Sequence, residues 1–270
     1  MKNKKKEDKL HWADEKEVIH TNIPLKLLVF LFKMLPSFFV LFLAYPVSFF
    51  YYLFSKRARE ESRTYQKNLK YFTGGKVPQK ISPYRQILSF SFCVLEKMQG
   101  WLGKFNFNRI EYQQDDIDIL LNQLKENKGA LLISSHQGNL ELMRSLSENN
   151  KQLVGHVVPV VAIMESNATK QFNQTLSQIN SNFDLNLIDP AQIGPDTICT
   201  LMDFIERGAL VIISGDRTSA RSRDKFLSKN FLGKLAPFPY GTFLIPFLLK
   251  APVYYMFGFR SKNSIFNPKY

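Results

Sequence analysis

Short apolar runs alternate with amphipathic segments along residues 83–258, and this alternation constrains the fold more than any other feature of the chain. Apolar runs of a few residues, bounded by polar or glycine residues, are typical of buried strands, and the segments between them have helical spacing. Strands are expected at 130–135, 152–163, 184–189, 209–214 and 252–258, and helices at 83–102, 138–149, 166–179 and 195–207. Because strands and helices alternate, the sequence predicts an α/β fold: a central, mostly parallel sheet flanked by helices.

Three regions of the chain differ in composition. Residues 1–23 form a basic, polar stretch that is expected to be a flexible tail, and residues 24–60 form a hydrophobic, membrane-associated segment. Residues 61–270 show no internal repeat and are expected to form one domain. Its first expected helix, 83–102, places four apolar residues on one face at helical spacing: Ile87, Phe90, Val94 and Met98.

The apolar run at residues 27–54 is interrupted by Lys33, Pro36 and Pro46. A helix over 37–54 would be about 27 Å long, close to the hydrocarbon thickness of a bilayer. A single span, a buried core element, and a hairpin or pair of interfacial helices all remain open. The last arrangement is favoured, because "KNKKK" precedes the run and "SKRARE" follows it, so that positive charge lies on both sides.

Charge and cysteine content narrow the partners and the compartment. The chain has 36 Lys and Arg against 23 Asp and Glu, a net charge of +13, which favours anionic partners such as lipid head groups, phosphorylated substrates or acidic carrier proteins. The two cysteines, Cys93 and Cys199, lie far apart and indicate a reducing compartment without a disulfide framework or zinc site. No nucleic-acid-binding motif is present, and nucleic acid is not an expected partner.

Polar residues follow two of the expected strands where each strand ends: Ser134-Ser135-His136 and Ser214-Gly215-Asp216-Arg217. In parallel sheets, groups that act on ligands gather at the carboxyl ends of strands. A histidine just before a helix can fold back over its first turn, so His136 could meet Glu141. Such a carboxylate leaves the other imidazole nitrogen able to take a proton. The alternative is a structural histidine at a strand end, with Glu141 on a solvated helix face.

Four blocks of the sequence occur in the order found in one enzyme family. They are "YPVSFFYYLF" with "RAREESRTY", "GALLISSHQGNLELMRSL", "GALVIISGDRTS" and "FLGKLAPFPYGTFLIPFLLKAPVYYMF". Over most of residues 25–260 the chain resembles the lipid A biosynthesis (late, secondary) acyltransferase branch of the lysophospholipid acyltransferase superfamily. Glycerol-phosphate acyltransferases of that superfamily usually carry FPEGTR, whereas Tyr240 and Phe243 replace the acid and the arginine here, which argues against glycerol-phosphate recognition. Members of the branch usually continue past the position of Tyr270, so a truncated C-terminus is one expectation.

The resemblance implies transfer of a fatty acyl group from an acyl carrier protein (acyl-ACP) or CoA thioester to a hydroxyl group. His136 would be the general base and Glu141 its orienting carboxylate, and no cofactor or metal is expected. Backbone amides near Gly138 would stabilise the oxyanion, and arginines after Asp216 would bind phosphate oxygens. The expected substrate-binding residues are Gly138, Asn139, Asp216, Arg217, Arg221, Arg223 and Gly241. A further aromatic set either lines an acyl groove or belongs to the core: Phe231, Phe238, Tyr240, Phe243 and Phe247.

The expected acceptor is a lipid or glycolipid, such as a lipid A precursor in lipopolysaccharide biosynthesis. The expected location is the bacterial inner membrane, with the catalytic domain on the cytoplasmic side, which follows from the resemblance together with the cysteine content. Two alternatives stay open: a thioesterase-like hydrolase that uses the same base on water, and a non-catalytic, membrane-anchored protein that binds lipid or carrier protein.

Overall fold

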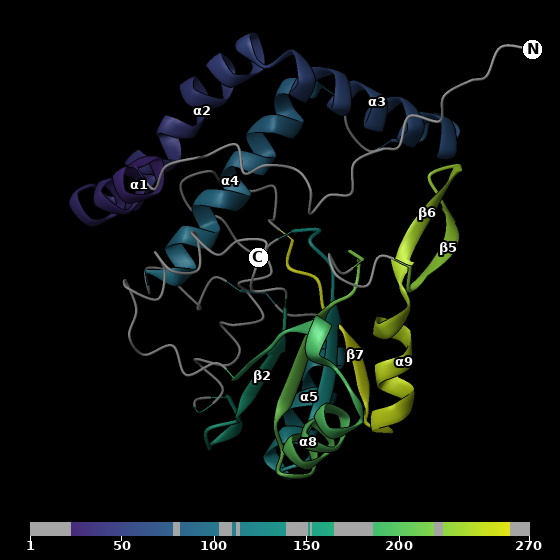
Figure 1. Cartoon of the computed structure of the whole chain (residues 1–270). Helices are drawn as coiled ribbons and strands as arrows, with labels where there is room; N and C mark the ends of the chain where they lie inside the picture. Colours follow the sequence, from purple (N-terminus) through teal and green to yellow (C-terminus); the bar gives the residue numbers. More distant parts are fainter. Residues whose placement is uncertain are drawn as a thin grey trace, which may run out of the picture.

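The computed structural model of the protein describes residues 23–77, 82–102, 110–111, 114–138, 151, 153–164, 186–218 and 224–259. The α-helices are α1 (Ile23–Met34), α2 (Ser37–Phe54), α3 (Lys56–Phe72), α4 (Pro83–Trp101), α5 (Gln114–Lys125), α8 (Pro195–Glu206) and α9 (Tyr240–Leu249). The strands are β1 (Ala130–Ser134), β2 (Val160–Ile163), β3 (Asn186–Ile188), β4 (Leu210–Ser214), β5 (Phe226–Phe231), β6 (Lys234–Pro239) and β7 (Val253–Tyr255). Figure 1 shows a sheet with helices around it, and helices α1 to α4 above the sheet.

Five strands form one sheet in the order β3-β2-β4-β1-β7, and each neighbouring pair is parallel. The central pair, β1 and β4, is in register from Ala130 opposite Leu210 to Ser134 opposite Ser214. The predicted parallel α/β sheet flanked by helices is therefore confirmed. The strand expected at 152–163 is shorter than predicted and begins at Val160, and the helices expected at 138–149 and 166–179 fall largely or wholly outside the described residues.

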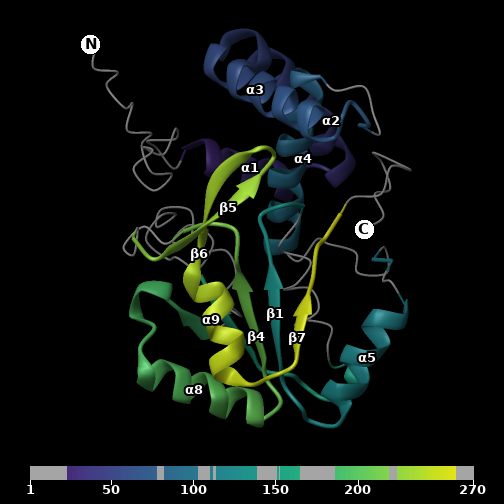
Figure 2. The same cartoon turned by 90° about the vertical axis from the view of Figure 1, so that its right-hand side faces the viewer.

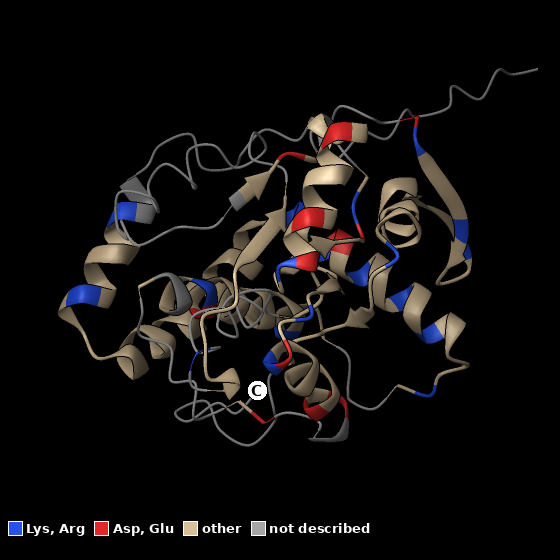
Figure 3. Ribbon diagram, turned by 90° about the horizontal axis from the view of Figure 1, so that it is seen from below, with Lys and Arg blue, Asp and Glu red and all other residues tan. Residues whose placement is uncertain are grey.

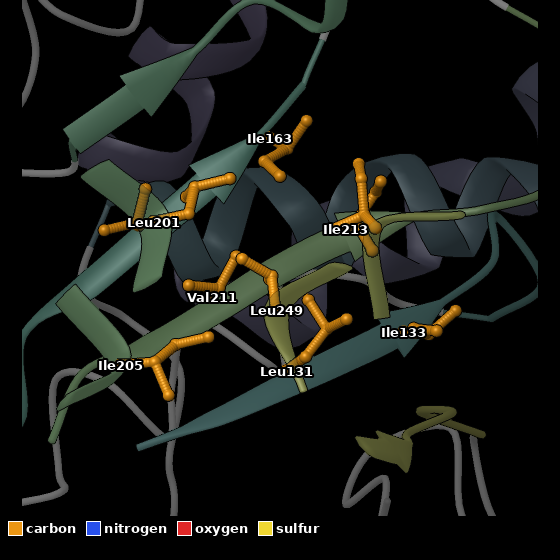
Figure 4. Packing of buried hydrophobic residues seen from close by; sticks show 10 residues of the cluster. Leu131, Ile133, Ile163, Leu201, Ile205, Val211, Ile213 and Leu249 are labelled. Carbon is orange, nitrogen blue, oxygen red and sulfur yellow. The ribbon is translucent and has the colours of Figure 1, made fainter. Parts of the chain in front are cut away.

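Alternating side chains of the strands form a core on each face of the sheet. On one face Leu131, Val211 and Ile213 contact Leu201 of α8 and Leu249 of α9 (Figure 4). On the other face the neighbouring positions Ala130, Leu132 and Leu210 contact Leu120 and Leu124 of α5. Figure 2 shows α8 and α9 together, away from α5. Burial on both faces explains why the strands read as continuous apolar runs in the sequence.

Helices α1, α2 and α4 share a separate apolar cluster above the carboxyl ends of the strands. Its buried members are Val29, Phe32, Val40, Leu41, Ala44, Phe92, Leu95 and Met98. The apolar face predicted for α4 is only partly correct, since Met98 is fully buried but Phe90 is 72% exposed. The face of α4 that packs against α2 carries Phe92 and Leu95 instead, because neighbouring helices decide which of several apolar stripes is covered.

Helix α2 shows how the hydrophobic segment is arranged. Pro36 separates α1 from α2, whereas Pro46 lies inside α2 without ending it. Among the described helices, α2 alone has the length and hydropathy that a membrane span requires, judged by length and composition. Only 22% of it is buried, which does not fit a buried core element. Its covered face packs against α4, where the Ser48 hydroxyl donates to Ser91 Oγ at 2.8 Å.

The hairpin β5–β6 and helix α9 were not predicted from the sequence. The hairpin is an antiparallel, two-stranded sheet with a two-residue turn at Leu232 and Gly233, both at positive φ, which is the conformation that tight hairpin turns favour. The interpretation of the aromatic set as core is wrong for most of it. Phe231 contacts Phe238 edge to face, and four of the five are exposed: Phe231, Tyr240, Phe243 and Phe247.

Candidate functional site

Two polar strand ends meet at the centre of the sheet, because β1 and β4 are neighbours. The amide of Gly215 donates to the carbonyl of Ser134 at 2.8 Å, which continues the β1–β4 pairing past the last strand residues. On the other side of β1, the Ser134 hydroxyl donates to the carbonyl of Met256 at 2.6 Å. The segment that leads to His136 is therefore held between β4 and the continuation of β7.

His136 and Asp216 form a two-point contact at this edge. The ring nitrogen Nδ1 of His136 lies 2.8 Å from Oδ1 of Asp216, and the backbone amide of His136 donates to Oδ2 at 2.9 Å. The two side chains are 32% and 30% exposed, so the pair is half-buried and still open to solvent. One carboxylate thus fixes both the backbone and the ring of the histidine.

The hydrogen bonds of the pair determine that Asp216 is ionised and which ring nitrogen of His136 carries the hydrogen atom. Burial raises the pKa of the Asp216 carboxyl, but hydrogen bonds from the ring and amide of His136, the charge of that ring when it is protonated, and a hydrogen bond from Ser214 together outweigh burial and lower the pKa to about 2. An ionised carboxylate only accepts hydrogen bonds. Nδ1 of His136 therefore carries a hydrogen atom and donates a hydrogen bond to Asp216. In the neutral ring Nε2 is then the unprotonated nitrogen, and no described residue hydrogen-bonds to it.

Ser214 belongs to the same cluster but is not placed as a nucleophile. Its hydroxyl donates to Asp216 Oδ1 at 3.1 Å and lies 3.0 Å from Nδ1 of His136. A serine activated by histidine contacts the nitrogen that the carboxylate does not hold. Ser214 contacts the same nitrogen as Asp216, so it supports the pair on the Nδ1 side and makes no bond to Nε2.

A close backbone contact supports the loop after His136. Gly138 has φ +82°, and a Cβ added there would lie 2.0 Å from the carbonyl oxygen of Gly258. The thiol of Cys93 in α4 donates to the carbonyl of Gly138 at 3.2 Å. The loop is therefore held between the extension of β7 and the helix above it, and only glycine fits at this position.

The other predicted site residues differ in what the structure describes. Arg217 is exposed directly after Asp216, and Gly241 lies in the first turn of α9. The neighbouring Thr242 is buried against Gly215, where an added Cβ would lie 2.4 Å from its methyl carbon, so the start of α9 adjoins the turn after β4. Four predicted site residues lie outside the described residues: Asn139, Glu141, Arg221 and Arg223.

The sequence indicated Asp216 only as a substrate-binding residue, and it placed Ser214 in the same polar strand end without a role of its own. Ser214 ends β4 and Asp216 follows it, and both reach His136 because β4 lies beside β1. The sequence does show that two strands end in polar residues. It does not show that these two strands are neighbours in the sheet, and the pairing of their ends depends on that strand order.

The fold and the site together define an α/β protein with a histidine–aspartate pair at the carboxyl edge of a parallel sheet. In the part of the chain that the structure describes, no group of three or more His, Cys, Asp or Glu side chains is arranged to hold a metal ion. No family model and no curated protein matches the chain.

The lowered pKa of Asp216 predicts a stability that depends on pH in acid. The folded pKa of about 2 lies below the ordinary value of 3.8, so the contribution of the pair is fully present above about pH 4 and is lost as the pH falls through about 2. The shift corresponds to at most about 2 kcal/mol, because solvent screens a pair that is only half-buried. We expect the difference in unfolding free energy between the wild type and Asp216→Asn to shrink by about this amount on acidification, measured by urea unfolding. A difference that is constant with pH would contradict the assignment.

Proposed function

We propose that this protein is a membrane-associated O-acyltransferase that moves a fatty acyl chain from an acyl-ACP or CoA thioester to a hydroxyl of a lipid or glycolipid. The observation that carries the proposal is the contact between Nδ1 of His136 and the ionised Asp216, which leaves Nε2 as an acceptor at the carboxyl edge of the sheet. The resemblance to the lipid A (late) acyltransferase branch supports the same reaction and suggests a lipid A precursor as one acceptor.

In the proposed reaction, Nε2 of His136 takes the proton of the acceptor hydroxyl while the hydroxyl oxygen attacks the thioester carbonyl carbon. The carbon–sulfur bond then breaks, and the thiolate leaves with the proton that His136 returns. General-base assistance of this kind typically contributes about 10²- to 10⁴-fold. A thiolate is a good leaving group, so the mechanism needs no acyl-enzyme, in accord with the position of Ser214 on the Nδ1 side.

We assign the orienting role to Asp216, since its carboxylate holds the ring and backbone of His136 at 2.8 and 2.9 Å. It keeps the proton on Nδ1 and stabilises the imidazolium that forms when Nε2 is protonated. Glu141, to which the sequence assigned this role, stays a candidate for a second contact with the histidine or with the acceptor.

Charged groups near the pair support an anionic donor. Arg217 follows Asp216 directly, and Arg221 and Arg223 come later in the same segment of the sequence. A guanidinium group binds phosphate oxygens in a bidentate manner, which suits the pantetheine phosphate of either donor. The net charge of +13 favours an acidic carrier protein over CoA, and no part of the proposal requires nucleic acid.

We propose that α1 and α2 lie in the plane of the membrane, at the cytoplasmic side of a bacterial inner membrane. The covered face of α2 is held to α4 through Ser48 and Ser91, whereas the opposite face exposes large apolar side chains such as Phe42 and Phe50. A helix with one packed and one apolar exposed face suits the interface between head groups and acyl chains. This arrangement also agrees with the basic residues on both sides of the segment.

The experiment that tests the function is mass spectrometry of membrane lipids from cells that express the wild type, His136→Ala or His156→Ala. His156 precedes β2, away from the carboxyl ends of the strands, and serves as a matched control. We expect a lipid heavier by one acyl unit with the wild type and with His156→Ala, and not with His136→Ala at equal protein levels in the membrane. Release of free fatty acid without an acylated lipid would identify a hydrolase instead. The absence of any histidine-dependent product would refute catalysis by this site.

A further inference from the structure

The end of α3 and the turn of the β5–β6 hairpin meet, although they lie far apart in the sequence (Figure 1). A Cβ at Gly233 in the turn would lie 3.9 Å from the ring of Tyr71. Around this contact, four large apolar side chains project into solvent: Tyr71, Phe72, Phe231 and Leu235. Tyr71 is 84% and Leu235 is 77% exposed, so these are among the least covered apolar side chains described. We call the four residues the tip surface.

The charge around the tip surface has one sign. Residues 62–77 and 225–239 contain seven basic residues and no Asp or Glu: Arg63, Lys67, Lys70, Lys76, Lys225, Lys229 and Lys234. The acidic residues of α3 lie in its first half, where Glu60 and Glu61 pair with Lys56 and Arg57. Figure 3 shows Lys and Arg along the helix and the hairpin at the right, which is the same side as in Figure 1.

The shape of the tip surface favours a bilayer over a folded partner. The hairpin extends from the domain as a separate, two-stranded sheet, and Phe231 and Leu235 beside its turn are both exposed. A stable protein interface needs roughly 800 Å² of complementary surface on each partner, whereas a bilayer takes up single projecting side chains. Basic residues beside such side chains are attracted to the phosphates of anionic lipids.

We propose that the tip surface is a second membrane contact, separate from α1 and α2, that binds anionic phospholipid. Tyr71, Phe72 and Leu235 enter the head-group region, and the lysines of the hairpin and of α3 bind lipid phosphates. In Figure 1 the tip surface and helices α1 and α2 lie on opposite sides of the carboxyl edge of the sheet. Two separate contacts prevent rotation about α2 and hold the His136–Asp216 edge facing the lipid. The contact does not depend on acyl transfer.

The test places a nitroxide label at the tip in the full chain, bound to phosphatidylcholine vesicles with or without phosphatidylglycerol. The label is attached to Leu235→Cys in a protein that also carries Cys93→Ser and Cys199→Ser. The control label is attached to native Cys199, which is exposed on α8, in a protein that carries Cys93→Ser alone. We expect the label at 235 to become accessible to oxygen and protected from a water-soluble nickel complex in the anionic vesicles. The label at Cys199 stays accessible to nickel in both vesicle types.

Charge reversal provides the second arm of the test. Lys229→Glu with Lys234→Glu is expected to return the label at 235 to water, whereas Lys125→Glu with Lys250→Glu changes the net charge equally at the other end of the molecule and leaves the label in lipid. A label at 235 that stays accessible to nickel while the protein floats with anionic vesicles would overturn the proposal. So would protection that appears only on addition of an acyl carrier protein, which would make the tip surface a carrier-docking site.

Discussion

Asp216→Asn is expected to lower the rate of the proposed acyl transfer by about 10³- to 10⁴-fold, as the loss of the orienting carboxylate does in histidine-dependent triads. The carboxylate accepts from Nδ1 and from the backbone amide of His136, and the amide of asparagine can keep only part of this arrangement. An asparagine that presents its NH₂ group to the ring would stabilise the tautomer with the proton on Nε2. The base would then be blocked without any change in the fold.

The rate is measured with purified protein in mixed micelles, from the acyl-ACP donor and the acceptor identified by lipid mass spectrometry. Glu141→Gln is the informative comparison, because the sequence assigned the same role to Glu141. If Asp216 orients the ring, Asp216→Asn lowers kcat far more than Glu141→Gln does, and both proteins unfold cooperatively at about neutral pH. A large loss with Glu141→Gln and nearly full activity with Asp216→Asn would reverse the assignment.

Gly138→Ala is expected to abolish the proposed transferase activity and to cost more than about 2 kcal/mol of folding free energy, or to displace the loop after His136. The positive φ alone costs an alanine about 1 kcal/mol. The added methyl group would also lie 2.0 Å from the carbonyl oxygen of Gly258, a backbone atom that cannot move without disturbing the extension of β7. Ser134 bonds to this extension at Met256, so a shift there would reach the strand end that carries His136.

Gly155→Ala separates the effect of the positive φ from the effect of the close contact with Gly258. Gly155 also has a positive φ, of +97°, but nothing lies within 4 Å of its Cβ position. We expect this variant to lose about 1 kcal/mol in chemical unfolding and to keep the proposed transferase activity. Equal stability losses in the two variants, with activity retained in both, would show that the contact between Gly138 and Gly258 does not hold the site.

Some elements of the fold could be predicted from the sequence, and others could not. The strands β1 and β4 and the helix α8 were predicted nearly to their ends, because a strand buried on both faces and an amphipathic helix leave local patterns. The hairpin β5–β6 was missed, since Pro237 and Pro239 weaken the strand pattern and its turn contains Leu232 at positive φ. In α4 the pattern gave the helix but not the buried face, which depends on its contacts with α1 and α2.

The sequence by itself determined that this chain forms a parallel α/β sheet with polar strand ends, and that His136 stands at one of them. It determined these features because strand burial, helix periodicity and the placement of polar residues at strand ends are local properties of the chain. Only the tertiary structure decided that Asp216 is the carboxylate that holds His136. That pairing joins residues 80 positions apart, and it exists because β4 inserts between β1 and β2, an order set by packing across the whole sheet.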